Sequence, residues 1–104
     1  MSQPIPAAYR RFQQKYPDIF NAYSTLGATI HSQSTLSERE RALIKLGTAV
    51  GSQQEGSVHA QVRKAIDAGV AADEIRQVVL LSIPSLGFPA MMAAMTWVDD
   101  ILGE

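Results

Sequence analysis

Hydrophobic residues recur at helical spacing from the beginning of the chain. Two prolines within residues 1–6 indicate an extended arm, and a first helix is predicted over about 6–16. Pro17 suits the first turn of a second helix, which is predicted to run from about Asp18 to Ser32. Spacings of four, three and four residues place one apolar stripe on this second helix, made of Ile19, Tyr23, Leu26 and Ile30.

The middle of the chain predicts two further helices. Ser37 and Glu40 have the spacing of a capping box, which opens a third helix. We expect this helix to end near Gly51, with glycine as the residue that follows the last turn. After residues 52–54, which form a short turn or the first part of the next helix, a fourth helix runs to about Ala68, and Gly69 ends it.

The last two predicted helices, about 73–83 and 90–102, are apolar on most sides. Acidic residues favour the first turn of the earlier one, and Pro84 and Gly87 interrupt the chain between them. Helices that are apolar all round have to be buried, and a monomer of 104 residues has little room for two of them. We therefore expect them at a subunit interface. A buried strand over 78–83 is the competing interpretation, but no alternating segment elsewhere would pair with it.

Length and composition indicate one small all-α domain, residues 1–104, of about six helices. No repeat or long linker divides the chain. Charged residues make up only 18%, which is below the usual share of about a quarter. A small protein has much surface, so this low charge is explained if part of the surface is covered in an oligomer.

Composition also excludes several classes of function. The formal net charge is −1 and no run of Lys or Arg stands out, so we expect no nucleic-acid partner. The longest apolar run, 87–98, is too short to span a bilayer, and residues 1–6 do not resemble a signal peptide. We therefore expect a soluble cytoplasmic protein with no membrane partner. The chain has no cysteine, which excludes disulfides, thiolate metal sites and thiol peroxidase chemistry.

Glu40 is the first candidate catalytic residue. It occupies the position between Leu36 and Leu43 on a stripe that continues through Gly47 and Val50, so its carboxylate falls on the face expected to pack inward. Burial raises the pKa of a glutamate unless a cation or hydrogen-bond donors compensate, which prepares a general acid or base. Alternatively, Glu40 only caps its helix by accepting a hydrogen bond from the backbone N–H of Ser37. The two roles do not exclude one another.

Glu55 and His59 form the second candidate group. They are four residues apart on one helix face, where a carboxylate can fix the imidazole tautomer and raise its pKa. Ser52, one turn earlier, is a candidate to contribute a hydroxyl, and Lys45 and Arg63 are candidate cations for an anionic substrate. The alternative is a polar helix end with a structural histidine.

A metal triad of the two glutamates and His59 is also conceivable, because Glu–x–x–x–His places two ligands on one helix face. No second ligand pair is present, however, and His31 is distant in sequence. We therefore predict no metal site.

Several short motifs occur together in a fixed order: Leu36–Ser–x–Arg39–Glu40–Arg–x–Leu43, Glu55–x–x–x–His59, Ala65–x–x–Ala68–Gly69–Val70, Glu74–Ile75 and Gly87–Phe–Pro89. In this order and spacing the chain resembles the carboxymuconolactone decarboxylase family, which includes the AhpD-like alkylhydroperoxidases. The resemblance covers about residues 36–102. It implies an AhpD-like helical bundle that self-associates as a trimer or hexamer.

The resemblance also implies where the site lies. In the AhpD-like branch a Cys–x–x–Cys pair precedes the histidine, and a glutamate on the preceding helix completes a proton relay. Glu40 and His59 match the glutamate and histidine positions, whereas Ser52 and Glu55 stand at the cysteine positions. Because a hydroxyl and a carboxylate cannot replace two thiols, we expect no thiol peroxidase activity and a closer likeness to the decarboxylase branch.

The resulting expectation is a cofactor-independent enzyme that decarboxylates or isomerises a small carboxylated molecule. His59 would be the general acid, Glu55 would tune it, and Glu40 would be a second proton-transfer group, at a site between the third and fourth helices. The alternative is an oligomeric protein that binds a small ligand without turnover.

Overall fold

The computed structural model describes residues 5–103, which form seven α-helices and no strand. The helices are α1 (Ala7–Lys15), α2 (Pro17–Ser32), α3 (Glu38–Ser52), α4 (Glu55–Asp67), α5 (Ala72–Leu80), α6 (Ile83–Leu86) and α7 (Phe88–Leu102). The predicted all-α class is confirmed, and α6 adds a single turn to the six predicted helices. The strand interpretation of 78–83 is wrong. Residues 1–4 of the predicted arm lie outside the described residues.

The described chain divides into two compact units. Residues 5–36 form the N-terminal hairpin, and residues 37–103 form the helical body. The single domain expected from the sequence stays a prediction.

In the N-terminal hairpin, α1 and α2 pack against each other. The rings of Tyr9 and Phe20 meet edge to face, with their centroids 5.7 Å apart. Neither helix contains a buried residue. The stripe predicted on α2 does lie on one helix, but all four of its side chains are exposed.

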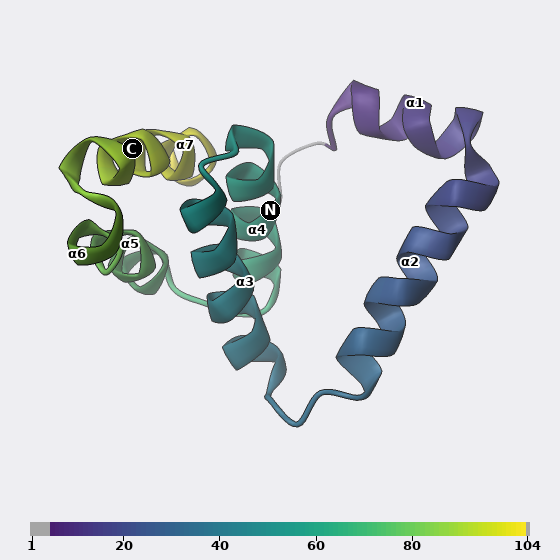
Figure 1. Cartoon of the computed structure of the whole chain (residues 1–104), viewed down its shortest axis with the longest axis horizontal. Helices are drawn as coiled ribbons and strands as arrows, with labels where there is room; N and C mark the ends of the chain where they lie inside the picture. Colours follow the sequence, from purple (N-terminus) through teal and green to yellow (C-terminus); the bar gives the residue numbers. More distant parts are fainter. Residues whose placement is uncertain (1–4, 104) are drawn as a thin grey trace. The chain divides into compact units, whose positions relative to one another are not determined.

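The helical body contains the hydrophobic core. In it α3 packs on α4 and α5, and α7 packs on α4, α5 and α6 (Figure 1). The buried side chains are Leu46, Ala49, Val50, Val58, Val62, Ala65, Val70, Ile75, Val79, Met91, Ala94 and Val98. Every one of the four longer helices of the body contributes to this core, so the packing holds α4 and α7 in a fixed relation.

Both ends of α3 are determined by side chains. The Ser37 hydroxyl accepts from the Glu40 N–H, and the Glu40 carboxylate accepts from the Ser37 N–H at 2.8 Å, which confirms the capping box. The helix ends at Ser52, near Gly51 as predicted, but the expected terminating glycine is wrong, because Gln53 adopts the left-handed conformation, with φ of 55°. The Gln53 side-chain amide donates to the carbonyls of Val50 and Ala90, and these bonds offset the backbone strain.

The start of α5 is held by a contact with α3. The Glu74 carboxylate accepts from the Ala71 N–H at 2.9 Å and pairs with the Arg39 guanidinium. The hydrogen bond from Arg39, followed by the one from Ala71, lowers the pKa of Glu74. At the other end of the α4–α5 link, Gly69 has φ of 85° and ends α4 as predicted.

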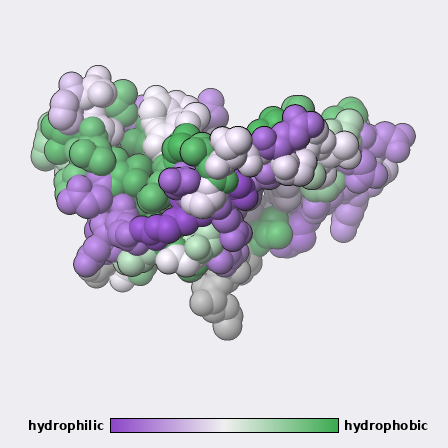
Figure 2. All heavy atoms as spheres, turned by 90° about the horizontal axis from the view of Figure 1, so that it is seen from below, coloured by the Kyte–Doolittle hydropathy of each residue, from purple (hydrophilic) through white to green (hydrophobic). Residues whose placement is uncertain are grey.

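The apolar helix α7 is only partly covered within the chain. Met91, Ala94 and Val98 are buried, whereas Phe88 and Met92 are exposed. Figure 2 shows hydrophobic side chains gathered on the part of the helical body that carries α5, α6 and α7. The expected subunit interface there stays a prediction. Within residues 5–103, none of the helices has the length and apolar character needed to cross a membrane.

Candidate active site

His59 lies where α4 packs against α7. Its Nε2 is 3.0 Å from Oδ2 of Asp100, in the last turns of α7. The imidazole is 22% exposed and the Asp100 carboxylate is 48% exposed. The ring is therefore held at the junction of two helices, with one edge accessible from the surface.

Glu55 is the second carboxylate at this imidazole. Its Oε2 is 3.9 Å from His59 Nε2, across one turn of α4. This confirms the predicted proximity of Glu55 and His59. Glu55 also stands at the first position of α4, where the positive end of the helix dipole favours a carboxylate. The two carboxylates and the imidazole form one cluster, whose three nearest polar atoms all lie within 4.8 Å of one another.

The hydrogen bond to Asp100 determines the tautomer of His59. An ionised carboxylate only accepts hydrogen bonds, so Nε2 carries the proton and donates it to Asp100. In the neutral ring Nδ1 then has a free electron pair. Within residues 5–103 no hydrogen bond reaches Nδ1. Nδ1 is therefore the nitrogen suited to exchange a proton with a bound molecule.

Asp100 is the site residue that the sequence reasoning missed. It is 41 residues from His59, so the contact depends on the packing of α4 against α7. One signal was available: two aspartates end a helix whose carbonyl end disfavours negative charge, so each needs a partner. The structure supplies both partners, because Asp99 pairs with Arg76 of α5 at 3.4 Å and Asp100 pairs with His59.

Glu40 does not have the environment expected from the sequence. Its side chain is exposed, so the expectation of a buried carboxylate with a raised pKa is wrong. The hydrogen bond from the backbone of Ser37, followed by the one from its hydroxyl, lowers the pKa of Glu40 instead. The stripe argument failed because Glu40 is in the first turn and bends back to cap it. The capping interpretation is confirmed, and no contact joins Glu40 to His59 in the described chain.

The three predicted substrate-binding residues lie in different environments. The Ser52 hydroxyl donates to the carbonyl of Ala49 at 2.7 Å, which is a local bond within α3. Lys45 is half-buried, and desolvation, followed by the charges of Lys64 and Arg41, lowers its pKa. Arg63 is half-buried on α4, one turn beyond His59 on the same face. None of the three makes a hydrogen bond or ion pair with His59.

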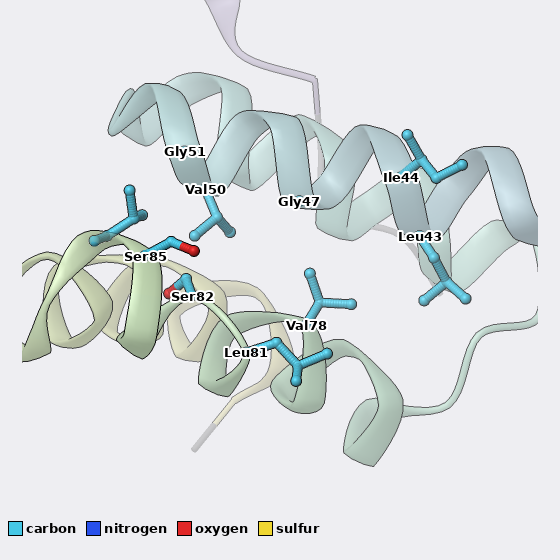
Figure 3. A pocket seen from close by; sticks show the side chains of 10 residues that line it. Leu43, Ile44, Gly47, Val50, Gly51, Val78, Leu81, Ser82 and Ser85 are labelled. Carbon is cyan, nitrogen blue, oxygen red and sulfur yellow. The ribbon is translucent and has the colours of Figure 1, made fainter.

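A separate apolar cleft lies between α3 and the α5–α6 segment. It has a volume of about 510 Å³, and Val50 and Leu43 face Val78 and Leu81 across it (Figure 3). Ser82 and Ser85 add two hydroxyl groups to one wall. None of the residues predicted to form the site lines this cleft. The histidine cluster lies between α4 and α7, and the site expected between the third and fourth helices stays a prediction.

Comparison with known protein sequences places the chain in a family. A sequence model of the carboxymuconolactone decarboxylase family matches residues 17–100, so the match begins in α2, before the motifs that start at Leu36. An uncharacterized protein of Methanocaldococcus jannaschii is 27% identical over 90 residues, which cover 86% of this chain and 86% of that protein. Because the family model matches most of its length, the chain belongs to the carboxymuconolactone decarboxylase family.

Proposed function

We propose that this protein is an enzyme that transfers a proton to the carbon skeleton of a small carboxylated molecule, with His59 as the general acid. The observation that carries the proposal is the His59–Asp100 hydrogen bond of 3.0 Å, with Glu55 beside it. A carboxylate that fixes the tautomer and orientation of a histidine is a common arrangement for proton transfer. Asp100 and Glu55 act here as positioning residues.

The reaction class that suits this arrangement is decarboxylation of an unsaturated lactone that carries a carboxylate. The bond between the carboxylate carbon and the ring breaks, carbon dioxide leaves, and the electron pair moves into the conjugated lactone as an enolate. The imidazolium of His59 then gives the proton on Nδ1 to carbon and becomes neutral. The proton returns from solvent, so the cycle consumes no other reactant.

Arg63 is the cation that we propose for the substrate carboxylate. It follows His59 by four residues on α4, so the two side chains share a helix face. Within residues 5–103 Arg63 makes no hydrogen bond or ion pair. A guanidinium can accept a carboxylate through two parallel hydrogen bonds. It would offset the repulsion that Glu55 and Asp100 exert on an anionic substrate.

Carbon dioxide release from carboxymuconolactone, and from related unsaturated lactone carboxylates, tests this proposal. We expect His59→Gln to reduce kcat by about 100-fold or more, because proton transfer by a positioned side chain contributes on that order. Asp100→Asn should lower kcat less and should change the ¹⁵N chemical shifts that report the tautomer of His59. Arg63→Gln should raise KM. His31→Gln, which alters the other histidine, should leave turnover unchanged. Full turnover in His59→Gln would refute the assignment.

Self-association is part of the proposed function, as a trimer or hexamer. The exposed stripe on α2 and the exposed Phe88 and Met92 on α7 support it, because large apolar side chains at the surface mark contact sites. A neighbouring subunit would cover these side chains and limit access of water to the surface around them.

A second candidate function is ligand binding without turnover. The apolar cleft between α3 and the α5–α6 segment supports it, because its volume of about 510 Å³ is in the usual range for small-molecule sites. Native mass spectrometry of the purified protein would reveal a retained small molecule. Replacing Gly47 by Leu would fill the floor of the cleft and should release that molecule, whereas loss of turnover in His59→Gln would favour the enzyme.

A further inference from the structure

We propose that Glu55, His59 and Asp100 together form a binding site for a divalent transition-metal ion, with zinc as the best match. The Nε2 atom of His59 is 3.0 Å from Oδ2 of Asp100 and 3.9 Å from Oε2 of Glu55. All three atoms lie within 4.8 Å of one another. Ligands about 2.1 Å from a tetrahedral ion are separated by roughly 3.4 Å, so small side-chain rotations suffice to place an ion among them.

The ligand chemistry favours zinc over magnesium or calcium. Zinc binds both imidazole nitrogen and carboxylate oxygen, whereas magnesium and calcium prefer oxygen ligands alone. Two carboxylates carry a charge of −2, which a divalent ion neutralises. This compensation supplies a reason for two carboxylates to lie beside the same imidazole.

The three ligands are positioned for binding and leave one side open. His59 is largely covered at the junction of α4 and α7, while the Glu55 and Asp100 side chains are 59% and 48% exposed. Glu55 and His59 come from one turn of α4. Asp100 comes from α7, which packs against α4 through the hydrophobic core. Three protein ligands with an accessible fourth position are typical of zinc sites that also hold a water molecule or a substrate oxygen.

Metal binding goes beyond the proposed function and does not require turnover. It replaces the sequence-based prediction of no metal site, which was made without Asp100. A metal ion on Nε2 replaces the proton that His59 donates to Asp100, so the metal-bound and hydrogen-bonded states exclude each other. If the proposed proton transfer is correct, zinc should inhibit it. Binding itself is measured without substrate, so failure of one proposal is distinguishable from failure of the other.

Isothermal titration of the untagged full chain with zinc chloride tests the site. We expect one ion per chain, and an affinity that falls by about tenfold or more in His59→Gln and in Asp100→Asn, because each removes a ligand. His31→Gln and Asp99→Asn are matched controls, since they alter the other histidine and the neighbouring aspartate, and should bind zinc as the wild type does. Magnesium should bind much more weakly.

Cobalt provides a measurement on the unaltered protein. Co²⁺ bound by three protein ligands in tetrahedral geometry should give intense visible absorption, which zinc should then displace. Zinc should also raise the Tm of the wild type, because a ligand that binds only the folded state stabilises it. These two readouts remain informative if a variant does not fold. Undiminished zinc binding in His59→Gln, or no tetrahedral cobalt spectrum in the wild type, would overturn the proposal.

Discussion

Leu46 on α3 and Leu26 on α2 each belong to an amphipathic helix, yet Leu46 is 0% exposed and Leu26 is 58% exposed. The same contrast holds for the two units as wholes. The helical body encloses a core of buried side chains, whereas the N-terminal hairpin contains none. An apolar stripe therefore predicts a helix reliably, but it does not say which surface covers the stripe.

The difference has an energetic consequence for the hairpin. Burying one large aliphatic or aromatic side chain contributes about 1.5–3 kcal/mol. Four such side chains lie on the α2 stripe, and all of them are exposed in the single chain. Two short helices without a buried core are marginal in water. The hairpin therefore gains the most from a partner surface, which agrees with the proposed self-association.

The largest expected effect comes from matched leucine substitutions in the two units. Leu46→Ala should lower the free energy of unfolding by about 2–5 kcal/mol, because it leaves a cavity in the core. Leu26→Ala should cost much less in a monomer at low concentration, because its side chain is already largely hydrated there. Urea unfolding followed by circular dichroism measures both. Equal losses in dilute solution would contradict the contrast between hairpin and body.

A charge on the α2 stripe should dissociate the assembly. Leu26→Lys places an ammonium group where a partner would bury an apolar side chain, and the lost burial is worth about 1.5–3 kcal/mol per interface. Light scattering after size-exclusion chromatography should show a multiple of 11.3 kDa for the wild type and a smaller mass for the variant. Asn21→Lys adds the same charge to α2 off the stripe, and it should keep the wild-type mass. A wild-type protein that runs as a monomer would refute the assembly.

Local signals in the sequence predicted most of the fold. Pro17, the Ser37–Glu40 pair and Gly69 mark helix boundaries through backbone chemistry that acts over one turn, and the structure confirms each. The residue that ends α3 was predicted wrongly, as a glycine and not Gln53, because the bond from Gln53 to Ala90 spans 37 residues. A tertiary contact stabilises the left-handed conformation of Gln53. The residues that neighbour Gln53 in the sequence do not predict that contact.

Gln53→Gly tests how the backbone strain at Gln53 balances against the hydrogen bonds of its side chain. Glycine relieves the backbone strain of φ 55°, which is worth about 1 kcal/mol. The substitution also removes two side-chain hydrogen bonds, each worth about 0.5–1.5 kcal/mol. We expect a net loss of up to about 2 kcal/mol in thermal unfolding. A gain in stability would show that the bond to Ala90 contributes little to the helical body.

Only the part of the candidate site that lies on a single helix was predictable from the sequence. The i,i+4 relation of Glu55 and His59 is a property of helix geometry, so the sequence contained it. Asp100 was not predictable in the same way, because its position beside His59 depends on how α7 packs on α4. Glu40 illustrates the opposite error, since its position on an apolar stripe suggested burial, whereas the capping box that overlaps the stripe keeps its carboxylate at the surface.

The smallest expected effect is the acid sensitivity that Glu40 adds to the helical body. Hydrogen bonds from Ser37 lower the pKa of Glu40 from 4.5 in the folded state, so this carboxylate stabilises the fold above that pH. The contribution is lost as the pH falls from about 4.5 through the lowered pKa, because the unfolded chain takes up the proton first. Glu40→Gln keeps a side-chain oxygen for the Ser37 N–H but does not titrate. Its Tm should therefore fall less steeply than that of the wild type below pH 4.5.

Glu38→Gln removes the same charge from the same turn without touching the cap, so it isolates the effect of net charge. Parallel Tm curves for Glu40→Gln and the wild type would mean that the cap on α3 is not formed in solution.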